Sequence, residues 1–89
     1  MLPFAGIGIK PDFADRLDSG WLYLEFKYPK DRSRLNSVIT EMTSRVTVYR
    51  SQDARVMFLV YDPARTILDD SAFKNDFERH AGVRVVISR

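Results

Sequence analysis

Residues 55–61, RVMFLVY, most strongly constrain what this 89-residue chain can fold into. The run is almost continuously apolar, which suits a β-strand buried on both faces. Asp62-Pro63 ends it. A buried strand needs neighbouring strands and helices packed on the sheet, so the sequence predicts a layered structure that contains both helices and strands.

A long helix is predicted over residues 33–50, where apolar side chains recur at offsets of three, four or seven. The stripe consists of Leu35, Val38, Ile39, Met42, Val46 and Tyr49. Residues 45–50 (RVTVYR) also alternate like a strand. Helix is favoured because the stripe continues through Val46 and Tyr49.

A second helix is predicted to start with Asp69 or Asp70 as its N-cap and to end at Gly82. Phe73 and Phe77, four residues apart, mark its inner face. Residues 83–88 form the last predicted strand.

The segment before the long helix has the pattern of a β-hairpin over residues 11–28, with a turn at Asp18-Ser19-Gly20. Its second strand is WLYLEFKY, residues 21–28, and Pro29 ends it. Alternate residues of this strand point to opposite faces, so Glu25 and Lys27 share one face with the two aromatic residues before them. A short strand is also predicted at residues 7–10.

The predicted order is hairpin, helix, strand, helix, strand. A strand that returns through a helix to a neighbouring strand makes a right-handed parallel crossover. We therefore expect one α/β (α+β) domain over residues 1–89, with a mixed sheet formed by the hairpin and two further strands and with two helices packed on it.

Composition restricts the chemistry of any metal site. The chain has no cysteine and a single histidine, His80, so thiolate sites and histidine-rich zinc sites are excluded. Oxygen ligands favour Mg²⁺ or Mn²⁺. His80 lies at the end of the second predicted helix, where a structural role is expected.

The sequence predicts a cytoplasmic protein that does not enter the membrane. It holds no apolar run near the roughly 20 residues that span a bilayer, and its first ten residues lack the pattern of a signal peptide. Net charge is +2, but residues 27–34, KYPKDRSR, gather four basic residues against one acid. Such a cluster is either a solvated loop or a phosphate-binding surface.

Asp12 gives the Glu25–Lys27 pair a possible function. With a two-residue turn at Ser19-Gly20, Asp12 pairs with Lys27 and Ala14 with Glu25, so both acids and the lysine share one face. Adjacent carboxylates repel unless a cation lies between them, and a divalent metal supplies one. A shift by one residue would remove the site. The alternative is a solvent-facing Glu25–Lys27 ion pair.

The spacing of these residues resembles the PD-(D/E)xK nuclease superfamily, whose members have the restriction-endonuclease-like fold. Pro11-Asp12 is followed after twelve residues by Glu25-Phe26-Lys27. In bacterial members the second acid lies in a strand similar to LEFKY. Further likeness extends over about residues 10–89, in the helix that carries Glu41 and Tyr49, in FLVYDP (residues 58–63) and in GVRVVIS (residues 82–88).

The resemblance implies metal-dependent hydrolysis of phosphodiester bonds, in DNA or RNA. Asp12, Glu25 and the backbone carbonyl of Phe26 would bind Mg²⁺ or Mn²⁺, and Lys27 would be the catalytic lysine. Lys30, Arg32 and Arg34 would contact phosphates of the nucleic acid. Glu41 and Tyr49 would support the residues that bind the metal.

The chain departs from the family pattern at two places. Arg45 stands where relatives often have an acid, and only ten residues precede Pro11, where relatives have a helix and a strand. Apolar surface left bare would seek a partner, most simply a second copy in a homodimer. The alternative function is an inactive nuclease-fold module for binding or oligomerisation in a mobile-element or cassette protein.

Overall fold

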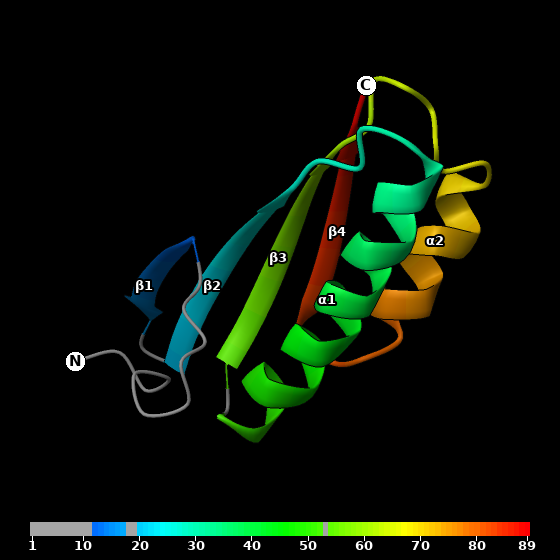
Figure 1. Ribbon diagram of the computed structural model, residues 1–89. Helices are drawn as coiled ribbons and strands as arrows, with labels where there is room; N and C mark the ends of the chain where they lie inside the picture. Colours follow the sequence, from blue (N-terminus) through cyan, green and yellow to red (C-terminus); the bar gives the residue numbers. More distant parts are fainter. Residues whose placement is uncertain (1–11, 18–19, 53) are drawn as a thin grey trace.

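The computed structural model describes residues 12–17, 20–52 and 54–89, which form one four-stranded sheet and two helices (Figure 1). In chain order the elements are β1 (Phe13–Leu17), β2 (Gly20–Lys27), α1 (Arg32–Ser51), β3 (Ala54–Tyr61), α2 (Asp70–Glu78) and β4 (Val83–Ser88). The predicted mixed sheet with two helices is confirmed. The strand predicted at residues 7–10 and the turn residues 18–19 lie outside the described part.

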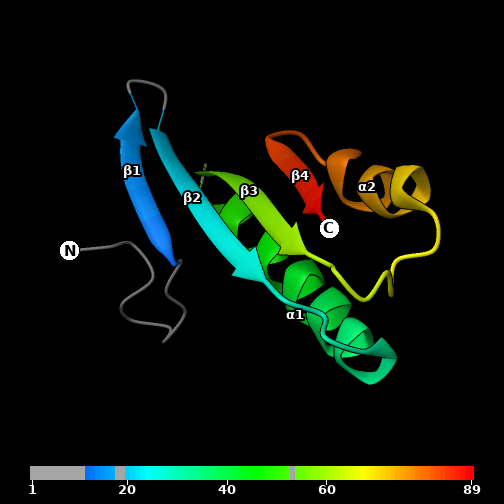
Figure 2. The same cartoon turned by 90° about the horizontal axis from the view of Figure 1, so that it is seen from above.

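The sheet has the order β1-β2-β3-β4, with β1 antiparallel to β2 and the other neighbours parallel. Figure 2 shows β1 at one edge and β4 towards the other. Each parallel step passes through a helix. Successive right-handed crossovers in one direction put their helices on the same side of a sheet, and α1 and α2 do lie on one side (Figure 1).

The core fills the space between the sheet and the two helices. β3 contributes Val56, Phe58 and Val60, which alternate with residues of the other face. The apolar stripe of α1 is buried as predicted, through Val38, Met42, Val46 and Tyr49. From α2, Phe77 brings its ring centroid to 6.2 Å from that of Phe58. The conflict over residues 45–50 is resolved for helix because this stripe is buried to its end.

The face of the sheet away from the helices carries apolar side chains that remain exposed. Phe13 is 53% exposed, Phe26 57%, Tyr61 51% and Val86 46%. The prediction that residues 55–61 are buried on both faces is therefore wrong for the described residues. The reason is the topology, because both crossover helices lie on the same side of the sheet and leave the other face without a helix from the described part of the chain.

Both helices begin with an aspartate whose carboxylate accepts a backbone hydrogen bond, as N-caps do. Asp31 accepts from the N–H of Arg34 at 2.8 Å, and Asp69 accepts from the N–H of Ala72 at 3.0 Å. The choice left open between Asp69 and Asp70 is thus settled for Asp69. Neither described helix is long and apolar enough to cross a membrane.

The predicted end of the second helix is wrong, because α2 ends at Glu78 and not at Gly82. Gly82 has φ +81°, but it belongs to the turn that enters β4. Its carbonyl accepts from the N–H of Val56 at 2.9 Å, which ties that turn to β3. The left-handed glycine therefore marks the start of a strand rather than the end of a helix.

The predicted hairpin register is also wrong, by two residues. Ala14 pairs with Tyr23 rather than with Glu25, and Leu17 pairs with Gly20. Gly20 already belongs to β2 rather than to the predicted two-residue turn. A shift of two residues leaves every side chain on its predicted face. Asp12 therefore still lies on the side of Glu25.

Candidate active site

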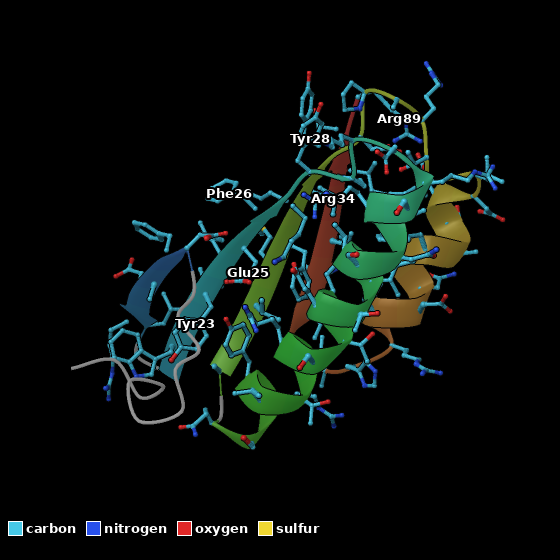
Figure 3. All side chains as sticks on the ribbon, viewed as in Figure 1. Tyr23, Glu25, Phe26, Tyr28, Arg34 and Arg89 are labelled. Atoms are coloured by element: carbon cyan, nitrogen blue, oxygen red, sulfur yellow. The ribbon has the colours of Figure 1, made fainter. Side chains whose placement is uncertain are left out.

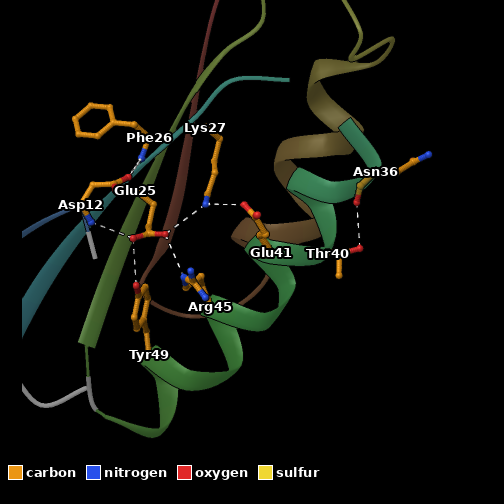
Figure 4. Close-up of polar contacts among 9 residues, drawn as sticks. All are labelled: Asp12, Glu25, Phe26, Lys27, Asn36, Thr40, Glu41, Arg45 and Tyr49. Atoms are coloured by element: carbon orange, nitrogen blue, oxygen red, sulfur yellow. Dashed lines mark hydrogen bonds and ion pairs between the residues drawn. The ribbon is translucent and has the colours of Figure 1, made fainter. Parts of the chain in front are cut away.

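Glu25 is buried in the middle of β2, with only 2% of its surface exposed. It points from the sheet toward α1 (Figure 3). The alternative of a solvent-facing Glu25–Lys27 pair is therefore wrong for Glu25. A buried carboxylate requires charged or hydrogen-bonding partners, and those of Glu25 come from three elements of the fold (Figure 4).

The first partner is Asp12, at the start of the hairpin. The backbone N–H of Asp12 donates to Glu25 Oε2 at 3.2 Å, and Asp12 Oδ2 accepts from the N–H of Phe26 at 2.7 Å. These two hydrogen bonds fasten the beginning of β1 across β2. They bring the two predicted metal-binding acids together more directly than the predicted register did.

The second partner is Lys27, two residues along the same strand. Its Nζ lies 3.6 Å from Glu25 Oε1 and 3.0 Å from Glu41 Oε2. The side chain of Lys27 is 11% exposed and that of Glu41 54%. The ammonium is therefore held between a buried and an exposed carboxylate, at the surface of the site.

The third set of partners comes from α1, where Glu41, Arg45 and Tyr49 follow one another at intervals of four residues and share one face. Arg45 Nε lies 3.3 Å from Glu25 Oε1, and the hydroxyl of Tyr49 donates to Oε2 at 3.2 Å. Burial, and then the charge of Glu25, raise the pKa of the Tyr49 phenol. It therefore stays protonated and donates its hydrogen bond.

The oxygen ligands around Asp12 and Glu25 suit a hard divalent cation in kind. Three carboxylates, those of Asp12, Glu25 and Glu41, face two cations, which leaves the cluster with a net charge of −1. Within the described ranges no three acid or histidine side chains form a metal-holding group. A metal here would thus rely on two carboxylates, a backbone carbonyl and further ligands from water or substrate.

A cleft of about 450 Å³ opens beside Lys27 and Glu41. Two of the predicted phosphate-contacting residues, Lys30 and Arg34, line it. Arg32 does not, because it lines a separate hollow between the beginnings of α1 and α2. The structure therefore brings Lys30 and Arg34 to the site and leaves Arg32 apart from it.

Sequence reasoning did not find that Arg45 contacts Glu25. From the sequence, Arg45 is only a basic residue where relatives often have an acid. Its position four residues after Glu41 and four before Tyr49 was the available signal, since both neighbours were already placed near the site. That spacing places Arg45 on the helix face of Glu41 and Tyr49, but it does not say which acid the guanidinium reaches.

His80 and the two aromatic residues of β2 pack against neighbouring side chains. His80 Nδ1 lies 3.2 Å from an amino group of Arg50, on the side of α1 away from Glu25. Trp21 stacks on Tyr23 with ring centroids 6.1 Å apart, and Tyr23 is buried against Tyr49 at 4.7 Å. Through Tyr23, these aromatic residues therefore pack against Tyr49, which donates to Glu25.

Asp62, just after β3, is a second buried acid with a different role. It accepts hydrogen bonds from the N–H and hydroxyl of Thr66 and from the N–H of Ile67, at 2.7 to 3.0 Å. Burial acts to raise the pKa of Asp62, but these hydrogen bonds and the charge of Arg89 outweigh it and lower the pKa. Asp62 therefore fixes the loop that leads to α2.

Searches of the chain against protein-family models, curated proteins and solved structures found no significant match in any of the three.

Proposed function

We propose that this chain is a metal-dependent phosphodiesterase that hydrolyses nucleic acid in the cytoplasm, with DNA as the first substrate to test and RNA as the second. The observation that carries the proposal is the meeting of Asp12, Glu25 and Lys27 beside a cleft lined by Lys30 and Arg34. The likeness of the sequence to the PD-(D/E)xK superfamily supports it. The restriction-endonuclease-like core belongs to this proposal.

In the proposed reaction, water adds across one P–O bond and the leaving sugar oxygen takes a proton. Asp12, Glu25 and the carbonyl of Phe26 would hold Mg²⁺ or Mn²⁺, which would lower the pKa of water and neutralise phosphate charge. Lys27 donates hydrogen bonds to a non-bridging phosphate oxygen as negative charge develops there. Its contact with Glu41 holds the ammonium beside the cleft that both residues line.

Lys30 and Arg34 attract the flanking phosphates of the strand. Such contacts give affinity and orientation without sequence recognition. Arg32, in its separate hollow, would contribute only long-range charge. Glu41 and Tyr49 are positioning residues, because they touch Lys27 and Glu25 rather than substrate.

The function is tested with plasmid and linear DNA in Mg²⁺ or Mn²⁺, using Lys27→Ala and a matched Lys74→Ala. Lys74 lies on α2, away from the acid cluster. We expect cleavage that EDTA abolishes, a loss of roughly 10²-fold or more in Lys27→Ala, and no loss in Lys74→Ala. Cleavage that persists unchanged in Lys27→Ala would show that this cluster is not an active site.

We also propose a second copy of the chain as partner. The face of the sheet opposite the helices exposes Phe13, Phe26, Tyr61 and Val86, and exposed apolar residues gathered on one face favour association. A face-to-face homodimer would cover it and leave both acid clusters on the helix side.

The second candidate function is an inactive nuclease-fold module for binding or oligomerisation, in a mobile-element or cassette protein. The contact of Arg45 with Glu25 favours it, because a guanidinium already neutralises the central carboxylate. It predicts a stable dimer and no metal-dependent cleavage in the experiment above.

A further inference from the structure

The carboxylate of Glu25 has a cation or a hydrogen-bond donor on every side that the structure describes. Oε1 faces Arg45 Nε at 3.3 Å and Lys27 Nζ at 3.6 Å. Oε2 accepts from Tyr49 and from the N–H of Asp12, both at 3.2 Å. A carboxylate offers about four lone-pair positions; three hydrogen bonds already use this one, and the Lys27 ammonium adds an ion pair.

Two partners of Glu25, Lys27 and Arg45, are charged, and their side chains differ in their freedom to move. Lys27 is fixed by its own strand and by Glu41, and its side chain is 11% exposed. Arg45 reaches the carboxylate from α1, and its side chain is 25% exposed. A long arginine side chain at the rim of a site can turn its guanidinium into solvent while its apolar stem stays packed.

A divalent cation cannot share Glu25 Oε1 with this guanidinium. Two positive charges within a few ångströms repel strongly where water is largely excluded. Arginine cannot relieve the repulsion by losing its proton. Metal binding at Glu25 Oε1 therefore requires that Arg45 leave that oxygen.

We infer that Arg45 is the resident cation of this site, which occupies the place of a divalent metal until the metal displaces it. The inference rests on the proposed metal-dependent function and assigns a regulating residue to it. Without metal, Arg45 neutralises Glu25 and stabilises the fold. With metal bound, the guanidinium is released beside the cleft, where it is available to a phosphate.

The first test compares Arg45→Gln with Arg50→Gln. Both variants remove one positive charge from α1, but Arg50 contacts His80 and not Glu25. Mn²⁺ affinity is measured by calorimetry without nucleic acid. We expect Arg45→Gln to bind Mn²⁺ roughly tenfold more tightly than the wild type or more, and Arg50→Gln to match the wild type. In EDTA, Arg45→Gln should melt at a lower temperature than the wild type, and Mn²⁺ should reverse much of that loss.

Equal Mn²⁺ affinity in Arg45→Gln and the wild type, or binding by neither, would overturn the inference. Arg45→Lys keeps the positive charge and should bind Mn²⁺ within about threefold of the wild type. If Arg45→Gln does not fold, the wild type is followed directly by ¹⁵N–¹H correlation spectra. The Arg45 Nε–H signal is assigned as the one that is missing from the spectrum of Arg45→Lys. Added Mg²⁺ should shift the Phe26 amide signal and expose the Arg45 Nε–H to solvent.

A shifted Phe26 amide with an unchanged Arg45 Nε–H would contradict displacement. The inference and the proposed function fail separately. Tighter Mn²⁺ binding in Arg45→Gln without cleavage of any nucleic acid would contradict the proposed nuclease function and support the competition between Arg45 and the metal. Cleavage by the wild type with no effect of Arg45 on metal affinity would do the reverse.

Discussion

At the scale of single residues, the two buried acids Glu25 and Asp62 have different roles. Glu25 accepts from one backbone N–H and is otherwise surrounded by charged and phenolic side chains, whereas Asp62 accepts from two backbone N–H groups and a threonine hydroxyl. Backbone partners cannot move aside without unfolding the loop. Side-chain partners can, and this difference places the candidate chemistry at Glu25.

Tyr49→Phe tests the support that Tyr49 gives to Glu25. The variant removes the hydroxyl that donates to Oε2, so the free energy of unfolding should fall by about 1.5–3 kcal/mol, as for a hydrogen bond to a charged group. Urea denaturation of Tyr49→Phe is compared with Tyr61→Phe, whose ring is exposed on the other face. Equal stability of the two variants would argue against a strong Tyr49–Glu25 hydrogen bond.

Asp62 gives a prediction for pH. Its pKa is lower in the folded than in the unfolded chain, where it is near 3.8. The resulting stability is therefore complete above pH 4 to 5 and is lost as the pH falls through the folded value. Asp62→Asn should unfold about 1–3 kcal/mol more easily at pH 7, with a smaller loss on acidification, in urea titrations from pH 7 to pH 3. Asp76→Asn, on the surface of α2, should retain the steeper dependence of the wild type.

At the scale of elements, the N-caps make the starts of the helices testable. Asp69→Ala should lower the free energy of unfolding by about 1 kcal/mol. Asp70→Ala loses only an exposed ion pair with Arg89, at 2.7 Å, and should cost less. Chemical denaturation measures both. A larger effect in Asp70→Ala would mean that the helix begins at the other aspartate.

Elements with a long buried stripe could be predicted from the sequence. α1 and β4 agree with the prediction to within a residue, because the burial of alternate or helically spaced apolar residues determines them. The end of α2 and the register of the hairpin could not, since each depends on hydrogen bonds to another strand or on one residue of a turn. The site survived the register error because strand parity, rather than pairing, decides which face Glu25 occupies.

The candidate site shows the same division. That Asp12, Glu25 and Lys27 share one face was predictable from parity within one hairpin, and Glu41 and Tyr49 were expected near them only from the resemblance. Arg45 was not, because its contact depends on how α1 lies against β2. Only a three-dimensional arrangement states that the basic residue on the helix reaches the buried acid on the strand.

At the scale of the whole molecule, the sheet has one covered and one open face. The open face is four strands wide, and its longest strands have eight residues. Strand rise and spacing give it at most about 26 Å by 19 Å, or roughly 500 Å² before side chains add to the accessible surface. This is of the order of one partner's share of a standard interface, about 800 Å² of accessible surface. Apolar residues on a face of this size fit a second copy of the same face.

The homodimer is tested by light scattering, which should give twice the chain mass of 10.3 kDa. Tyr61→Asp and Val86→Asp put charge on the open face and should shift the protein to monomer, because a buried unpaired charge costs several kcal/mol. Leu68→Asp is the control. Leu68 is 78% exposed, but it follows β3 in the loop before α2 and lies outside the sheet. A monomeric wild type, or equal dissociation by Leu68→Asp, would rule out the open face as the dimer interface while leaving the acid cluster untouched.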